Sequence, residues 1–172
     1  SDIGGVALGL STAARVAAAY AKVRAAGEKV PGATVDGVLV TPMRTGGTEL
    51  LAGVTVDPAF GPVLAVGLGG VWVEILKDTS LRVLPVEAAE VVRMLEELRG
   101  IELLRGARGA KPADLDALAL IIAAIGTAAL SLNGTLRALE VNPLWVCGDQ
   151  VEALDVLVAT GPDGSDGMEL SA

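Results

Sequence analysis

The sequence predicts an α+β domain in which a mostly antiparallel sheet is covered by helices. Short apolar runs alternate with turns rich in glycine and proline over residues 35–76, a pattern typical of strands joined by short turns. Two longer apolar stretches, residues 86–99 and 112–132, have helical length, and further short apolar runs close the chain. With 172 residues, the chain is long enough for one domain with a substantial core.

The first half of the chain predicts one helix followed by a meander of strands. Residues 1–10 are Gly-rich and extended. Ser11 is suited to cap the N-terminus of a helix that ends at Gly27. The strands expected after this helix are residues 35–40, 49–56, 63–66 and 71–76.

The second half predicts two helices and a closing set of strands. The first helix covers residues 86–99 and stops at Gly100, and the second begins with Pro112 in its first turn. The expected closing strands are residues 136–141, 143–146 and 151–158. The tail, residues 161–172, is rich in glycine, aspartate and serine, so we expect it to be disordered.

The composition excludes several kinds of chemistry. The chain contains no histidine, so imidazole catalysis and zinc held by imidazole are impossible with these residues alone. A formal charge of −8 disfavours nucleic acid as a partner, and no apolar run reaches the ~20 residues of a membrane span. No signal peptide is visible, and a single cysteine, Cys147, fits a reducing compartment. We therefore expect a cytoplasmic protein that binds neither nucleic acid nor membrane.

Acidic and amide side chains gather near the C-terminal end. The segments 139–144 and 154–155 flank a polar turn at residues 148–150, a pattern that predicts a β-hairpin. Such a hairpin would bring Glu140, Asn142 and Asp155 together, and oxygen ligands of this kind suit Mg²⁺. The alternative is that Asn142 and Pro143 form only a turn and the acids are solvated strand ends. The spacing leaves both interpretations open.

Several blocks of the sequence occur in an order that resembles a known family. The blocks are Ser1-Asp2-Ile3-Gly4-Gly5-Val6, Gly37-Val38-Leu39-Val40-Thr41-Pro42-Met43, Glu49-Leu50-Leu51-Ala52-Gly53-Val54, Asp57-Pro58-Ala59-Phe60-Gly61-Pro62-Val63, Gly67-Leu68-Gly69-Gly70-Val71, Lys77-Asp78, and Leu139-Glu140-Val141-Asn142-Pro143-Leu144 with Asp155. Together they are similar to the C-terminal part of the ATP-grasp domain of ADP-forming acyl-CoA (acetate–CoA) synthetases, and to the related β subunit of succinyl-CoA synthetase. The resemblance implies an ATP-grasp C-terminal lobe over residues 1–160, with part of the N-terminal lobe outside this segment.

The resemblance implies a site for ATP or ADP. The residues that it assigns to the nucleotide are Val38, Leu39, Val40, Glu49, Gly69 and Gly70. The three residues of the apolar segment would form the interlobe hinge, whose backbone reads the adenine edge. Glu49 would bind ribose hydroxyls, and the glycines would let backbone amides approach phosphates. The alternatives are a solvated strand start for Glu49 and a bare hairpin turn for the glycines.

The resemblance also implies a Mg²⁺ site. Asn142 and Asp155 match the two metal ligands of the succinyl-CoA synthetase type, and Glu140 is a supporting or alternative ligand. Lys77 and Arg82 are candidate phosphate contacts by charge and by their closeness to the glycine turn, and the alternative for both is a solvated basic side chain.

The implied function is the nucleotide- and Mg-binding part of an ADP-forming acid–CoA ligase, which converts acyl-CoA, ADP and phosphate into the acid, CoA and ATP. No catalytic residue is assigned within the chain. The CoA-binding and phosphohistidine-bearing domains would lie elsewhere in the same protein or in a partner subunit, so we expect the 172 residues alone to be inactive. One alternative is a regulatory ATP-grasp-like domain of a protein lysine acetyltransferase, and another is an inert docking domain. The sequence leaves open the small-molecule acid, the choice of ATP or GTP, and whether the protein is an oligomer.

Overall fold

The computed structural model describes residues 4–69, 78–132 and 134–161. The chain divides into two units, Ser1–Thr45 and Gly46–Ala172. The strand expected at 71–76, Gly70 and Lys77, and the tail beyond residue 161 lie outside the described residues.

The first unit consists of one helix and the two irregular segments that flank it. Helix α1 (Ala13–Gly27) begins after Thr12, whose hydroxyl accepts a hydrogen bond from the Arg15 amide at 3.3 Å. The N-cap is therefore one residue later than the expected Ser11. The strand expected at 35–40 is wrong: residues 33–45 form no regular secondary structure, because no strand of the described unit pairs with them. None of residues 4–45 is buried.

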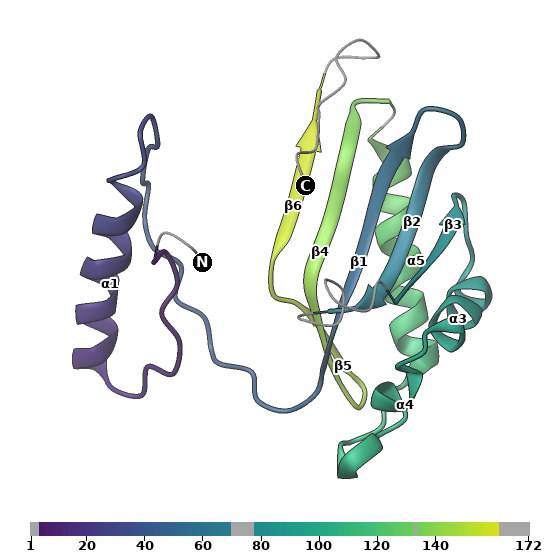
Figure 1. The fold of residues 1–172 in the computed structure, drawn as a ribbon, viewed down its shortest axis with the longest axis horizontal. Helices are drawn as coiled ribbons and strands as arrows, with labels where there is room; N and C mark the ends of the chain where they lie inside the picture. The colour runs from purple at the N-terminus through teal and green to yellow at the C-terminus, as the bar shows by residue number, and fades with distance from the viewer. Residues whose placement is uncertain (1–3, 70–77, 133, 162–172) are drawn as a thin grey trace. The chain divides into compact units, whose positions relative to one another are not determined.

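The second unit is built on an antiparallel sheet. Over its described residues the strands are β1 (Thr48–Asp57), β2 (Gly61–Leu68), β3 (Thr79–Val83), β4 (Leu136–Cys147), β5 (Gln150–Ala153) and β6 (Val156–Thr160). Their order is β3-β2-β1-β4-β5, and β6 also pairs with β4 (Figure 1). The predicted α+β class and antiparallel meander are confirmed, and β1 and β2 lie where two strands were expected.

The closing strands differ from the expectation in how they are divided. β4 runs without a break through residues 136–147, where two strands were expected, because β1 continues to pair with it on both sides of Asn142. The single strand expected at 151–158 is instead split into β5 and β6. Both pair with the same edge of β4, β5 with residues 144–147 and β6 with residues 136–141.

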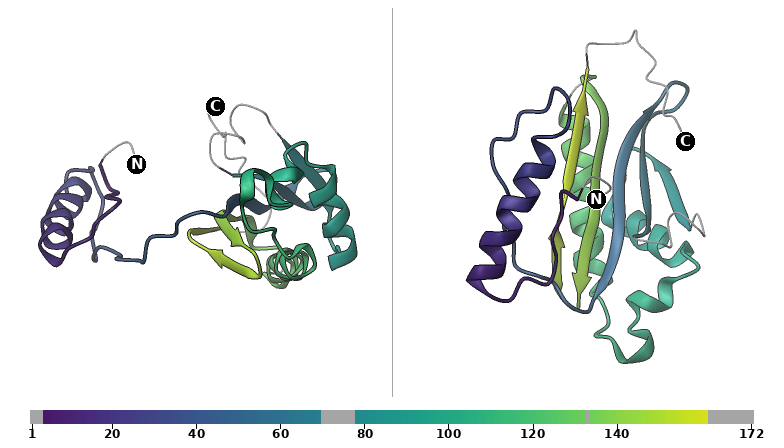
Figure 2. Two further views of the ribbon diagram at one scale, coloured as in Figure 1. Left: turned by 90° about the horizontal axis from the view of Figure 1, so that it is seen from below. Right: turned by 60° about the vertical axis from the view of Figure 1, so that its left-hand side comes forward.

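Helices cover one face of this sheet (Figures 1 and 2). They are α3 (Ala88–Glu97), α4 (Ile101–Leu104) and α5 (Leu115–Ser131), with a short 3₁₀ turn, η1 (Ala107–Gly109), before α5. The two long helices were predicted, but α5 begins after Asp114, whose carboxylate accepts from the Ala117 amide at 3.0 Å, rather than at Pro112. In the part of the chain that the structure describes, no helix is both long and apolar enough to span a membrane.

The core lies between these helices and alternate residues of the strands. The largest fully buried side chains include Leu50, Leu64, Leu68, Met94, Leu95, Leu118 and Ile122. Because side chains alternate along a strand, the residues between the buried ones of β1 face the other way. We call that side of the sheet the open face. It carries Glu49 of β1, Leu81 and Val83 of β3, which are 57% and 50% exposed, and Glu140 of β4.

Candidate functional site

Two irregularities of the sheet meet at the residues predicted to bind a metal. β4 holds one residue more than β1 at this point, so Asn142 and Pro143 together oppose Leu51 in a β-bulge. On the other edge of β4, Leu154 and Asp155 form the break between β5 and β6. Asn142 N–H donates to the Asp155 carbonyl at 3.1 Å, and Leu154 N–H donates to the Pro143 carbonyl at 2.9 Å. The bulge and the break are therefore joined directly.

Two of the three predicted ligands share one side of β4, and the third is a backbone neighbour. Asn142 Nδ2 donates to Glu140 Oε1 at 2.9 Å, so both side chains lie on the same side of β4. Asp155 lies in the break before β6, and its carbonyl accepts from the Asn142 amide at 3.1 Å. The structure thus brings Glu140, Asn142 and Asp155 close together at this junction. Their role as metal ligands stays a prediction.

The donor set at this junction suits a hard cation. The hydrogen bond to Glu140 occupies the Asn142 nitrogen and leaves its Oδ1 available as a ligand. Asn142 and Asp155 are exposed and Glu140 is half-buried, so water and phosphate oxygens can complete the coordination. Among the described residues, no group of three or more His, Cys, Asp or Glu side chains gathers to hold a metal. A cation here would therefore depend on the amide oxygen and on non-protein ligands.

Glu49 and Gly69, both predicted to bind the nucleotide, lie side by side. Glu49 is exposed at the start of β1, and its carbonyl accepts a hydrogen bond from the Gly69 amide at 2.7 Å. A Cβ at residue 69 would lie 3.0 Å from the Glu49 carbonyl carbon and oxygen, so glycine permits this close approach. Gly70 lies outside the described residues.

Trp145 organises the turn that precedes Glu49. It is the register partner of Glu49 on β4 and is only 7% exposed. Its Nε1–H donates to the Gly46 carbonyl at 2.8 Å. Gly47 has a φ of +74°, and a Cβ there would lie 2.5 Å from the Val146 carbonyl oxygen and 2.7 Å from the indole nitrogen. The sequence signal for this turn is the pair of adjacent glycines, Gly46 and Gly47, just before β1.

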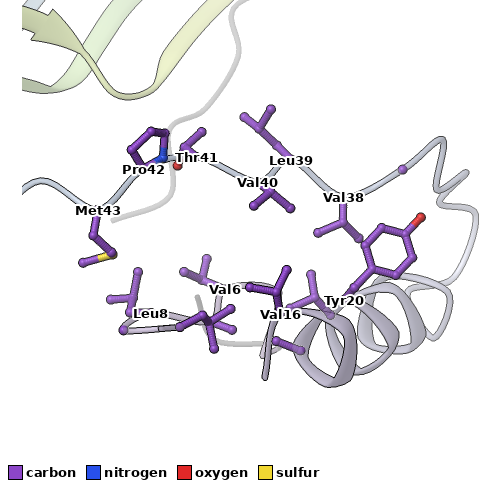
Figure 3. A pocket seen from close by; sticks show the side chains of 17 residues that line it. Val6, Leu8, Val16, Tyr20, Val38, Leu39, Val40, Thr41, Pro42 and Met43 are labelled. Carbon is purple, nitrogen blue, oxygen red and sulfur yellow. The ribbon is translucent and has the colours of Figure 1, made fainter. Parts of the chain in front are cut away.

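The residues predicted as the adenine hinge lie in the first unit. Val38, Leu39 and Val40 line an apolar cavity of about 520 Å³, enclosed by α1 and the segments 5–10 and 37–43. Figure 3 shows Val38 and Val40 pointing into this cavity and Leu39 pointing away from it, in agreement with the 85% exposure of Leu39.

Arg82 does not lie on the open face. It projects from β3 toward α3, where its Nε donates to Glu90 at 2.6 Å and a second guanidinium nitrogen donates to Glu97 at 2.5 Å. Ser80 accepts a weaker bond from the same guanidinium at 3.3 Å. Arg82 is therefore engaged in the contact between β3 and α3, and the structure gives no support to its predicted contact with phosphate. Lys77 lies outside the described residues.

Comparison with known proteins identifies the family. A family model for the ATP-grasp domain matches residues 1–159. The chain is 36% identical over 163 residues to acetate–CoA ligase (ADP-forming) I of Archaeoglobus fulgidus, covering 95% of this chain and 24% of that protein. It is 36% identical over 156 residues to the β subunit of acetate–CoA ligase (ADP-forming) I of Pyrococcus furiosus, covering 90% of this chain and 67% of that subunit.

A solved structure shares the fold. It is an acetyl-coenzyme A synthetase 1 of Ca. Korarchaeum cryptofilum in complex with coenzyme A, Ca-AMPCP and HgCl⁺. The TM-score is 0.82 at 34% sequence identity, and the match covers 93% of this chain and 70% of that one. The 172 residues thus span about a quarter of the Archaeoglobus fulgidus ligase and two thirds of the Pyrococcus furiosus β subunit. Because the family model extends over nearly all of the described residues, the chain belongs to the ATP-grasp domain family, of the type found in ADP-forming acyl-CoA synthetases.

Proposed function

We propose that the chain is the nucleotide- and Mg²⁺-binding part of an ADP-forming acid–CoA ligase. The whole protein would convert acyl-CoA, ADP and phosphate into the carboxylic acid, CoA and ATP. The observation that carries this proposal is the meeting of Glu140, Asn142 and Asp155 at the junction of bulge and strand break, in a chain of the ATP-grasp family. The named relatives are ligases, which favours this function over a regulatory domain of an acetyltransferase.

Asn142 and Asp155 would hold the cation, and Glu140 would orient the Asn142 amide so that its oxygen faces the metal. Bound Mg²⁺ would offset the charge of the phosphates during phosphoryl transfer. The chain's own contribution is rigid placement. Asn142 of β4 is joined to Asp155, in the break between β5 and β6, by a backbone hydrogen bond of 3.1 Å, and the adjacent Leu154 and Pro143 are joined by one of 2.9 Å.

Other residues on this chain would bind the nucleotide itself. The Glu49 carboxylate is exposed and would accept hydrogen bonds from ribose hydroxyls. Gly69, bound to the Glu49 carbonyl, fixes the end of β2 next to it. The apolar lining of the cavity at residues 38–40 suits the faces of an adenine ring, and the adjoining backbone groups suit its polar edge.

The chain would not carry the transferred phosphoryl group itself, because it contains no histidine. The phosphohistidine and the CoA site would be supplied by other domains of the same protein or by a partner subunit. Two comparisons support this arrangement: one relative is a β subunit, and one structurally similar protein holds coenzyme A. We also propose a cytoplasmic location, which the single cysteine favours.

The test is the substitution Asp155→Asn in the full-length protein, because it keeps the side chain's shape and removes its charge. Titration calorimetry with Mg-ADP, together with the Mg²⁺ dependence of ATP formation, should show at least a roughly 10-fold loss of apparent Mg²⁺ affinity. The matched control is Asp116→Asn, the same change on the exposed side of α5, which should leave both measurements unchanged. Wild-type Mg²⁺ dependence in Asp155→Asn would overturn the metal assignment.

A further inference from the structure

The turn at the start of the second unit is anchored by the indole of Trp145. The boundary between the units falls between Thr45 and Gly46, and Trp145 donates its N–H to the carbonyl of Gly46 at 2.8 Å. This bond joins residues 99 positions apart in the sequence.

The turn is tightly packed as well as hydrogen-bonded. Gly47 adopts a left-handed backbone with φ of +74°, and it lies so close to β4 that a Cβ would fall 2.5 Å from the Val146 carbonyl oxygen. The indole would be 2.7 Å from the same Cβ. This contact explains why Trp145, although it projects on the open face opposite Glu49, is 7% exposed.

The position of this contact links it to the proposed nucleotide site. Glu49 follows the turn by two residues and is paired with Trp145 itself. The segment that carries the predicted hinge residues 38–40 enters β1 through the same turn. Trp145 is also three residues from Asn142 on one strand, so β4 carries both the predicted cation ligand and the anchor of the turn.

We propose that Trp145 is a positioning residue for the nucleotide site. By holding the Gly46 carbonyl, the indole fixes the path of the backbone into β1 and with it the place of the Glu49 carboxylate. The inference rests on the proposed function, since it assigns Trp145 to the placement of a nucleotide-binding side chain. It predicts an effect on nucleotide affinity rather than on the chemical step.

The experiment compares two variants of the full-length protein that disturb the turn by different means. Trp145→Phe keeps an aromatic ring and removes the N–H, and Gly47→Ala places a methyl group where β4 leaves no room. A lost side-chain hydrogen bond shifts an equilibrium by about 2- to 10-fold. We therefore expect Trp145→Phe to raise the Kd and KM for Mg-ADP by that factor, with kcat and the KM for the acyl-CoA unchanged.

A second readout reports on the turn without any ligand. Hydrogen exchange followed by mass spectrometry measures how often the start of β1 opens, where Thr48 and Glu49 pair with Val146 and Trp145. Exchange at the start of β1 should be faster by about 2- to 10-fold in Trp145→Phe, as the lost hydrogen bond requires. The matched control is Thr127→Val, which deletes a side-chain-to-carbonyl hydrogen bond of 3.1 Å on the exposed side of α5. It should change neither the exchange nor the nucleotide affinity.

Wild-type nucleotide affinity in both Trp145→Phe and Gly47→Ala would overturn the inference, as would an equal loss of affinity in Thr127→Val. The result for Asp155→Asn separates this failure from a failure of the proposed function. If Asp155→Asn weakens Mg-ADP binding and the two turn variants do not, the positioning role alone is wrong. If the wild-type protein binds no Mg-nucleotide, the proposed function and the positioning role are wrong together.

Discussion

The amide of Asn142 is oriented by Glu140, two residues earlier on the same strand. Asn142 Nδ2 donates to Glu140 Oε1 at 2.9 Å, on the same side of β4. The contact is local, because residues two apart on a strand share a face. Its consequence is chemical: with the nitrogen engaged, the amide presents its oxygen at the junction where Asp155 lies.

This relationship predicts different outcomes for two substitutions of Glu140. Glu140→Ala removes the acceptor and should lower the Mg²⁺ affinity of the full-length protein by about 10- to 100-fold, the usual effect of losing a group that orients a metal ligand. Glu140→Gln retains an acceptor oxygen, so its Mg²⁺ affinity should fall much less. Calorimetric titration with Mg-ADP distinguishes them. Equal losses in both variants would show instead that the Glu140 charge contacts the metal directly.

Gly69 should not tolerate a larger residue. The methyl group of an alanine would lie 3.0 Å from the Glu49 carbonyl, so Gly69→Ala must push β1 and β2 apart at their ends. We expect a loss of about 1–3 kcal/mol in the free energy of unfolding, the usual cost of overpacking, measured by urea denaturation. Gly37→Ala is the control, because a Cβ there meets no atom within 4 Å. Equal stability of the two variants would contradict the predicted crowding.

Asp78 should be important for stability. It is 7% exposed, and its two carboxylate oxygens accept hydrogen bonds from the Arg99 and Gly100 amides at 2.9 and 3.0 Å, where α3 gives way to α4. Asp78→Ala leaves both amides without this acceptor and should cost about 1–3 kcal/mol for each. Asp78→Asn keeps one acceptor oxygen, so its free energy of unfolding should fall by roughly half as much. Urea denaturation of both variants is the measurement, and a wild-type midpoint for Asp78→Ala would exclude this role.

The contact between β3 and α3 should make stability depend on pH in the acid range. Hydrogen bonds from Arg93 and then from Arg82 lower the pKa of Glu90 below its ordinary value of 4.5. Hydrogen bonds from Arg82 and then from Ser80 lower the pKa of Glu97 in the same way. Groups with a lowered folded-state pKa stabilise the fold above the ordinary value, and this contribution is lost as pH falls through the folded-state pKa.

We therefore expect the urea midpoint of the wild-type protein to decline as the pH is lowered below about 4.5. In Arg82→Gln the two glutamates keep pKa values nearer to the ordinary one, so the decline over this interval should be shallower. Parallel pH profiles for the two proteins would show that Arg82 does not set these pKa values.

The elements that could be predicted from sequence are those fixed by local signals. The turn at Asp57 and the apolar runs on either side of it define the hairpin of β1 and β2, and the carboxylate of Asp57 accepts from the Ala59 and Phe60 amides at 2.8 and 2.9 Å. Helices α3 and α5 follow from long apolar stretches with clear ends. The short α4 has no such length, and it was not predicted.

The features that escaped prediction depend on partners distant in the sequence. Residues 35–40 have a strand-like composition, but without a paired neighbour in the first unit they form no strand. The face on which Arg82 lies is set by the register between β2 and β3, which composition does not encode. The convergence of Glu140, Asn142 and Asp155 was expected from a simple hairpin. The structure reaches it by a bulge opposite a strand break, because β4 pairs on both edges.

The β-bulge in β4 keeps the side chains on either side of it in the correct orientation. Val141 and Leu144 are both buried although three positions separate them, an interval that would put them on opposite faces of a regular strand. The bulge accommodates the additional residue, so Leu144 and Val146 return to the core side and Trp145 stays on the open face. A strand with the same interval and no bulge would instead direct Trp145 toward the helices and Val146 toward the solvent.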